Sequence, residues 1–168
     1  MIEKSSNISQ ITVRIADYQN RKDAQAILGL LSHYACDPMG GGEGLSDYVL
    51  NNLIDQLQKH YGAFSVLAYS DNVAVGLVNN FQTFSTFNCR PVINIHDVIV
   101  RDSHRGLKIA ERMLECVELE AKERGCCKLT LEVLEGNESA KKVYQRFGFN
   151  AYELDAKMGN AMFWQKVI

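Results

Sequence analysis

The spacing of apolar residues predicts alternating strands and helices along the first third of the chain. Apolar and polar side chains alternate over residues 11–15, which is typical of a strand. Apolar side chains then recur at helical spacing over residues 20–34, and again over residues 45–60, where Tyr48 and Leu57 are expected on the buried side. The glycine-rich residues 38–44 between these helices predict a flexible loop.

A β-hairpin is expected next. Residues 63–69 and 73–84 are apolar runs of strand length, and only a short polar segment, Ser70-Asp71-Asn72, separates them. Small polar residues of this kind suit a tight turn. The two runs are therefore predicted to pair as antiparallel strands.

The second half of the chain predicts strands that alternate with helices. A strand is expected over residues 92–100, a helix over 105–124, a strand over 128–134 and a helix over 137–147, with Asn137 as N-cap and Gly148 at the end. Two further strands are expected after Gly148. The order strand, helix, strand favours parallel neighbours, so the pattern predicts an α/β fold with a mixed central sheet, antiparallel early and parallel late, and helices on both faces.

Composition narrows the class of protein. A chain of 168 residues with 46% hydrophobic residues can form one domain, expected over residues 11–168 after a flexible segment at 1–10. The formal charge of −2 gives no field that would attract nucleic acid or an anionic membrane, so neither partner is expected. The polar N-terminus lacks a secretion signal, and no apolar run is long enough to span a bilayer, which predicts a cytoplasmic protein.

The cysteines do not predict a metal site. There are five, an odd number, and their spacing does not match any metal-ligand pattern. We expect them to be reduced thiols, and no metal cofactor is expected. The cysteines are the following: Cys36, Cys89, Cys116, Cys126 and Cys127.

The segment RGLKIA, residues 105–110, lies between a predicted strand and a predicted helix. The first turn of a helix has backbone N–H groups without intrahelical acceptors, at the positive end of the helix dipole. Small side chains at Gly106 and Ala110 allow an anion to approach the backbone, and Arg105 adds a positive charge. The segment therefore predicts a pyrophosphate site, although plain helix capping would give the same local pattern.

A second segment, NESAKKVYQRFGF at residues 137–149, follows one strand later. Together the two segments resemble the motifs of the GCN5-related N-acetyltransferase (GNAT) superfamily. Arg105 and Ala110 match the ends of the first motif, while Lys108 stands where the family usually has its central glycine. Asn137, Tyr144 and the Gly148-Phe149 pair fit the second motif.

The resemblance implies a single-domain GNAT-like fold that uses acetyl-CoA as co-substrate. The backbone of one strand would bind the pantetheine arm, the loop and first turn after it would hold the pyrophosphate, and the second motif would contact the cofactor from the following helix. The residues implied are Val98, Ile99, Val100, Arg105, Gly106, Leu107, Lys108, Ile109, Ala110, Glu111, Asn137 and Tyr144. Asn137 is equally expected as a helix N-cap.

Amine acetylation needs a proton donor for the leaving thiolate and a base for the amine. By resemblance Tyr144 is the candidate acid. Glu132, His96 and Asp97 are three candidates for the base. Neighbouring strand residues point to opposite faces, so only one of His96 and Asp97 can face the acceptor unless a β-bulge intervenes.

The sequence thus predicts an acetyl-CoA-dependent N-acetyltransferase that moves the acetyl group directly to a primary amine of a small molecule or peptide. Transfer through an acetyl-cysteine is the competing route, and no cysteine has a recognisable nucleophile setting. The alternative from another class is a non-catalytic acyl-CoA-binding or sensing module, which Lys108 favours. A homodimer through an exposed aromatic strand near Phe81, Phe84 and Phe87 is also a hypothesis.

Overall fold

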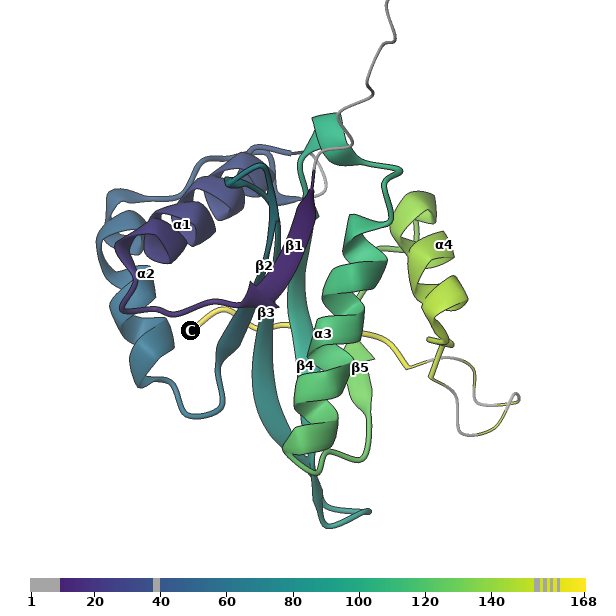
Figure 1. Cartoon of the computed structure of the whole chain (residues 1–168). Coiled ribbons are helices and arrows are strands. Elements are labelled where there is room, and N and C mark those ends of the chain that lie inside the picture. The colour runs from purple at the N-terminus through teal and green to yellow at the C-terminus, as the bar shows by residue number, and fades with distance from the viewer. Residues whose placement is uncertain (1–9, 38–39, 153–154, 156, 158, 160) are drawn as a thin grey trace, which may run out of the picture. The chain divides into compact units, whose positions relative to one another are not determined.

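Five strands form one mixed sheet in the order β1-β2-β3-β4-β5 (Figure 1). They are β1 (Ile11–Ile15), β2 (Phe64–Ser70), β3 (Val73–Ser85), β4 (Arg90–Val100) and β5 (Leu129–Leu131). The first three pairings are antiparallel and β4 pairs with β5 in parallel, which confirms the predicted mixed sheet. The computed structural model describes residues 10–37, 40–152, 155, 157, 159 and 161–168.

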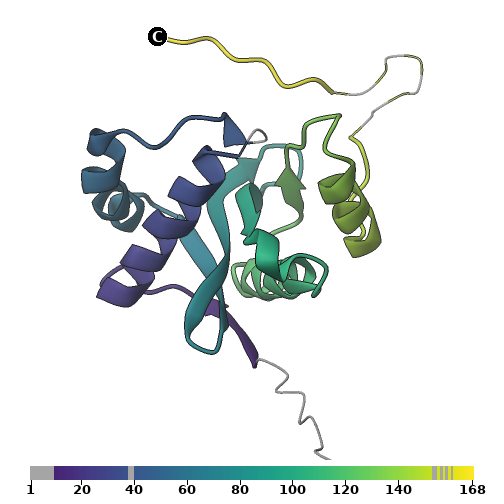
Figure 2. The same ribbon diagram turned by 90° about the horizontal axis from the view of Figure 1, so that it is seen from above.

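Helices cover both faces of the sheet, as predicted. Helices α1 (Arg21–Ala35) and α2 (Asp47–Lys59) lie on one face, which we call the α1/α2 face, and α3 (Ile109–Glu123) lies on the other, the α3 face (Figures 1 and 2). Leu57, Leu67 and Leu77 belong to the buried core on the α1/α2 face. On the α3 face a Cβ atom at Gly76 would come within 2.9 Å of the Met113 side chain, so glycine permits this close packing.

A partly buried ion pair fixes α1 to the sheet. The carboxylate of Asp23 is completely buried and accepts two hydrogen bonds of 2.6 Å from the Arg14 guanidinium and one of 2.7 Å from the Tyr69 hydroxyl. The hydrogen bonds from Arg14 are the main reason that the pKa of Asp23 is lowered to about 2. Burial, and then the bond to Asp23, raises the pKa of Tyr69 to about 12. These contacts join β1, α1 and β2.

The predicted helix 45–60 is confirmed with slightly different bounds. It begins at Asp47, and the Ser46 hydroxyl accepts the N–H of Val49 as its N-cap. The prediction that Tyr48 is buried is wrong, because its side chain is 74% exposed. Tyr48 precedes the buried Leu57 by nine residues, which at 100° per residue places it on the opposite side of the helix.

The predicted helix 105–124 begins later than expected. A short 3-10 helix, Asp102–His104, follows β4, and α3 starts only at Ile109. Between them Gly106 and Lys108 have φ values of 80° and 58°, which are incompatible with a right-handed helix. The predicted strand 128–134 is also shorter, since β5 ends at Leu131.

The residues after Leu131 form a compact unit of their own. Helix α4 (Glu138–Phe147) has Asn137 as N-cap and Gly148, with φ 107°, at its end, as predicted. The two strands expected after Gly148 are not seen in its described residues, while residues 153–154, 156, 158 and 160 of that segment, like residues 1–9 of the expected N-terminal segment, lie outside the description. In the described parts of the chain, no helix has both the length and the apolar character that a membrane crossing requires.

Candidate active site

A β-bulge in β4 determines how the candidate bases are presented. Asn79 of β3 pairs with Asp97, but the next residue, Asn80, pairs with Ile95, so His96 is an extra residue in β4. Asn79 lies two residues after the core residue Leu77 in β3, so its side chain is on the α1/α2 face. Asp97 pairs with Asn79 and therefore lies on the same face. The His96 ring contacts Phe81, which packs against the core on the same face. The bulge therefore presents His96 and Asp97 on one face.

Asp97 is held by a hydrogen-bonded line of side chains that crosses the sheet. Asn79 Nδ2 donates to Asp97 Oδ2 at 2.9 Å, and Ser65 Oγ donates to Asn79 Oδ1 at 2.7 Å. The Tyr18 hydroxyl lies 2.9 Å from the Ser65 hydroxyl. Ser65 and Asn79 are buried, whereas Tyr18 and Asp97 are half-buried.

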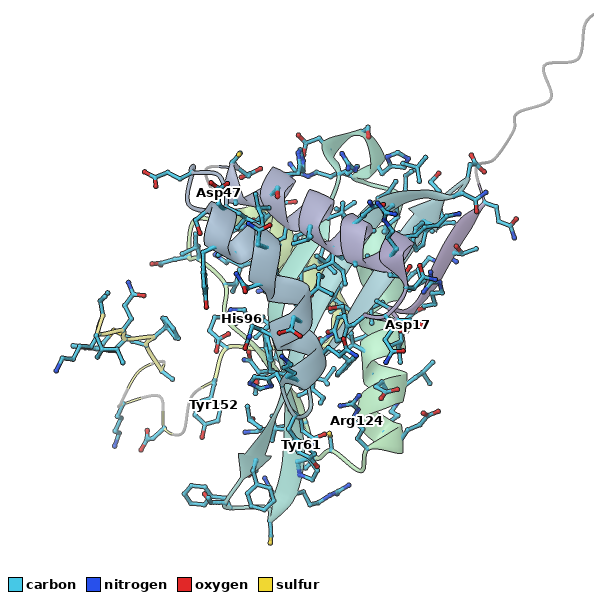
Figure 3. All side chains as sticks on the ribbon, turned by 90° about the vertical axis from the view of Figure 1, so that its left-hand side faces the viewer. Asp17, Asp47, Tyr61, His96, Arg124 and Tyr152 are labelled. Atoms are coloured by element: carbon cyan, nitrogen blue, oxygen red, sulfur yellow. The ribbon has the colours of Figure 1, made fainter. Side chains whose placement is uncertain are left out.

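His96 stands in an aromatic group beside the end of α2. The Phe81 ring lies between two imidazoles, with its centroid 5.1 Å from that of His60 and 5.5 Å from that of His96, both in edge-on geometry. Figure 3 shows His96 beside the C-terminal half of α2. Both imidazoles are exposed, so His96 is accessible from solvent while its ring orientation is restrained by Phe81.

Two carboxylates lie near enough to Tyr34 to affect its phenol. Burial raises the pKa of the Tyr34 phenol, and the charges of Asp97 and Asp37 raise it further. Asp37 follows α1 and lies 3.5 Å from the Arg105 guanidinium, which also contacts Asp102 at 2.8 Å. The end of α1, the bulge in β4 and the loop before α3 thus contribute charged groups to one region of the α1/α2 face.

The loop before α3 has the backbone shape of an anion site. Gly106 and Lys108 both take left-handed conformations, and Lys108 is the N-cap residue of α3 without a capping side-chain hydrogen bond. Turns of this kind direct successive backbone N–H groups to one side, next to the positive end of the helix dipole. Arg105, Gly106, Leu107 and Lys108 are exposed, so the loop is open to a ligand.

The second half of β4 has an edge that the described strands leave open. Parallel pairing with β5 runs from Ile93 to Ile95 and stops where the bulge begins. Beyond Ile95, the described sheet gives β4 one strand neighbour, β3. The backbone of Val98, Ile99 and Val100 lies in this stretch, which is where an extended ligand could pair like an added strand.

Three further candidates lie in the unit after Leu131. Glu132 directly follows β5 and is exposed, so its carboxylate lies outside the apolar strand. Asn137 Oδ1 accepts the N–H of Ala140 at 3.1 Å, which confirms its role as N-cap. Tyr144 is half-buried on α4, with its ring 6.0 Å from that of Phe149.

Sequence reasoning missed the residues behind Asp97. Ser65 and Asn79 are polar residues within otherwise apolar strands, and a buried polar group needs a hydrogen-bond partner. That requirement was the available signal. It does not reveal which partner is used, because Tyr18, Ser65 and Asn79 are far apart in the sequence.

Comparison with known proteins decides the family. Residues 28–149 match the sequence profile described as the acetyltransferase (GNAT) family. The chain belongs to this family. It is accordingly an N-acetyltransferase, as the two motifs predicted. Among curated proteins, the search finds no match.

Similar solved structures agree on the GNAT fold. A transcriptional regulator from Bacillus halodurans C-125 is 21% identical, with a TM-score of 0.74, and the match covers 92% of this chain and 100% of that one. AAC(6')-Iy in complex with a bisubstrate analogue is 20% identical, with a TM-score of 0.75 and coverage of 95% and 100%. A ribosomal-protein-alanine N-acetyltransferase from Brucella melitensis is 20% identical, with a TM-score of 0.65 and coverage of 87% and 99%. At these identities the likeness concerns the fold alone.

Proposed function

We propose that this GNAT protein transfers the acetyl group of acetyl-CoA directly to a primary amine at the bulge of β4. The observation that carries the proposal is the bulge created by the extra residue His96. It places the His96 imidazole and the Asp97 carboxylate on the same face of the sheet. The bulge also marks the end of the pairing between β4 and β5. A donor along the open edge of β4 would therefore end close to both groups.

The donor site we propose consists mainly of backbone. Val98, Ile99 and Val100 would pair with the pantetheine arm, and the segment from Arg105 to Glu111 would hold the pyrophosphate. Support comes from the left-handed residues Gly106 and Lys108 at the start of α3 and from the exposed Arg105 guanidinium. From the second motif, Asn137 and Tyr144 would contact the cofactor.

In the reaction, the amine nitrogen attacks the thioester carbonyl carbon, a C–N bond forms and the C–S bond breaks. A lysine-like ammonium must first lose a proton, which costs about 5 kcal/mol at pH 7. Asp97 is our preferred acceptor for that proton, with His96 and Glu132 as alternatives. Tyr144 would protonate the departing thiolate, since a phenol is protonated at neutral pH, and the second proton that the nitrogen loses as the amide forms would restore the phenol.

The acceptor we propose is a positively charged amine on a small molecule or peptide. The Asp97 carboxylate near Tyr34 gives this region negative charge, which favours an ammonium group, whereas Asp37 is ion-paired with Arg105. The bisubstrate complex of AAC(6')-Iy concerns that protein and does not identify the acceptor here.

Direct transfer is favoured over an acetyl-cysteine intermediate. All five cysteines are free, but burial raises the pKa of the Cys116 and Cys126 thiols, which lowers their thiolate fraction. Mass spectrometry of the intact protein after incubation with acetyl-CoA alone tests the point. We expect the unmodified mass, and a stable acetyl-cysteine would contradict direct transfer.

The second candidate function is a non-catalytic acyl-CoA-binding or sensing module. It is favoured by one observation, the side chain of Lys108 in a left-handed position where the family usually has glycine. Single variants Asp97→Asn, His96→Ala and Glu132→Gln separate the alternatives. If the protein is an enzyme, loss of the base lowers amine-dependent CoA release, and we expect the largest loss in Asp97→Asn. A binding module releases no CoA in response to an amine, so none of the variants changes it.

The homodimer stays a prediction. Phe84 and Phe87 at the end of the β3–β4 hairpin are 60% and 100% exposed, whereas Phe81 is half-buried against the core. Sedimentation of the wild type and of a Phe84→Ser, Phe87→Ser double variant tests it. We expect the double variant to be more monomeric if these rings form the contact.

A further inference from the structure

The hydrogen bonds behind Asp97 all donate in the same direction, from Tyr18 through Ser65 and Asn79 to Asp97. The single hydroxyl hydrogen of Ser65 is donated to Asn79 Oδ1, so Ser65 accepts its other bond from the Tyr18 hydroxyl. With Asn79 Oδ1 fixed as the acceptor, the amide Nδ2 is directed at Asp97 Oδ2. The amide orientation is thus set by its partners on both sides.

The line is shielded from water in its middle. Ser65 is 0% exposed and Asn79 is 3% exposed, so solvent does not replace a lost partner easily. The four side chains of the line come from the segment before α1 and from β2, β3 and β4. Asp97 is the member that lies at the bulge. In the described part of the chain, Asn79 is the side-chain hydrogen-bond donor to Asp97, and it engages Oδ2.

We infer that Asn79, oriented by Ser65 and Tyr18, is a positioning residue that holds Asp97 Oδ2 so that Oδ1 is presented to the acceptor amine. This inference rests on the proposed role of Asp97. An amide donates its hydrogen bond without giving up the proton, so the line does not conduct protons. The proton taken from the amine leaves Asp97 towards solvent, and the line fixes only the carboxylate geometry.

The chain offers a matched control for this role. Asn80 is the next residue of β3, is equally buried and also donates through its amide, but to the backbone carbonyls of Phe64 and Val78 on the α3 face. We expect Asn79→Ala to lower kcat/KM for the amine roughly 10- to 100-fold, because a misplaced catalytic group loses most of its effect. KM for acetyl-CoA is expected to stay within about 2-fold. Asn80→Ala is expected to lower Tm to a similar degree and to leave kcat/KM unchanged.

A double-variant cycle separates failure of this inference from failure of the proposed function. If Asp97→Ala keeps wild-type activity, the proposed role of Asp97 is wrong. If Asp97→Ala loses activity but Asn79→Ala does not, the positioning role alone is wrong. The inference predicts that adding Asn79→Ala to Asp97→Ala lowers kcat/KM by less than about 2-fold.

Ser65→Ala keeps the inference testable if Asn79→Ala does not fold. This variant leaves Asn79 and Asp97 in place but removes the donor that orients the amide. We expect kcat/KM for the amine to fall about 3- to 10-fold, with KM for acetyl-CoA unchanged. Equal losses in Ser65→Ala and Asn80→Ala would show a general packing effect and would overturn the inference.

Discussion

Replacing Lys108 by glycine should stabilise the protein although it removes a complete side chain. Lys108 has φ 58° and ψ 27°, a left-handed conformation in which the Cβ atom approaches the neighbouring carbonyl oxygen. Its side chain is exposed and makes no capping hydrogen bond to α3. Glycine can take the same backbone conformation without this steric cost.

The magnitude follows from two opposing effects. A non-glycine residue in the left-handed region costs about 1–2 kcal/mol, while glycine loses about 0.4–1 kcal/mol more unfolded-state entropy on folding. The net gain expected for Lys108→Gly is about 1 kcal/mol. For a chain of 168 residues this raises Tm by about 3 °C.

Thermal unfolding of three variants tests this reasoning. Lys108→Ala keeps the strained conformation and should change the free energy of unfolding by less than about 0.5 kcal/mol. Gly106→Ala should destabilise by about 1 kcal/mol through its φ of 80° alone, since no atom beyond the two adjoining residues lies within 4 Å of the added Cβ. A lower Tm for Lys108→Gly, or an equal rise in Lys108→Ala, would refute the backbone argument.

Three further predictions concern stability and the two motifs. Because the pKa of Asp23 is about 2 in the folded protein against an ordinary 3.8, its contribution to stability is complete above that ordinary value and is lost as the pH falls towards 2. Tm measured from pH 6 to pH 2 should therefore fall more steeply in the wild type than in Asp23→Asn. Arg105→Ala should raise KM for acetyl-CoA about 10-fold with a smaller change in kcat, and an unchanged KM would contradict a phosphate role. Tyr144→Phe should lower kcat roughly 10- to 1000-fold with little change in acetyl-CoA affinity measured by thermal shift, whereas unchanged turnover would contradict its role as acid.

Local chemistry explains which elements the sequence predicts well. Asp71 and Asn72 take φ values of 47° and 68°, the conformations that a two-residue hairpin turn requires and that these residue types tolerate. Asn137 and Gly148 limit α4 because an amide caps the first turn and glycine accepts φ 107° at the end. Such signals depend on neighbouring residues and are visible in the sequence.

The sequence does not display the strand register that creates the bulge, nor the backbone conformation that delays the start of α3. One extra residue in β4 leaves the apolar pattern nearly unchanged, yet it brings His96 onto the same face as Asp97. Lys108 is an ordinary helix former by propensity, so its left-handed conformation before Ile109 is not predicted locally. The two motifs predict a donor site from the sequence. The side chains behind Asp97 can be identified only when the register of β2, β3 and β4 is known.

Amine-dependent release of free CoA distinguishes an acetyltransferase that uses Asp97 from a protein that only binds acetyl-CoA. Wild type and Asp97→Asn are incubated with acetyl-CoA and a panel of primary amines, and Tm is recorded with acetyl-CoA alone. We expect a higher Tm for both proteins, CoA release by the wild type with at least one cationic amine, and release lowered at least about 10-fold in Asp97→Asn. A raised Tm without CoA release from any amine would contradict catalysis and favour an acyl-CoA-binding module.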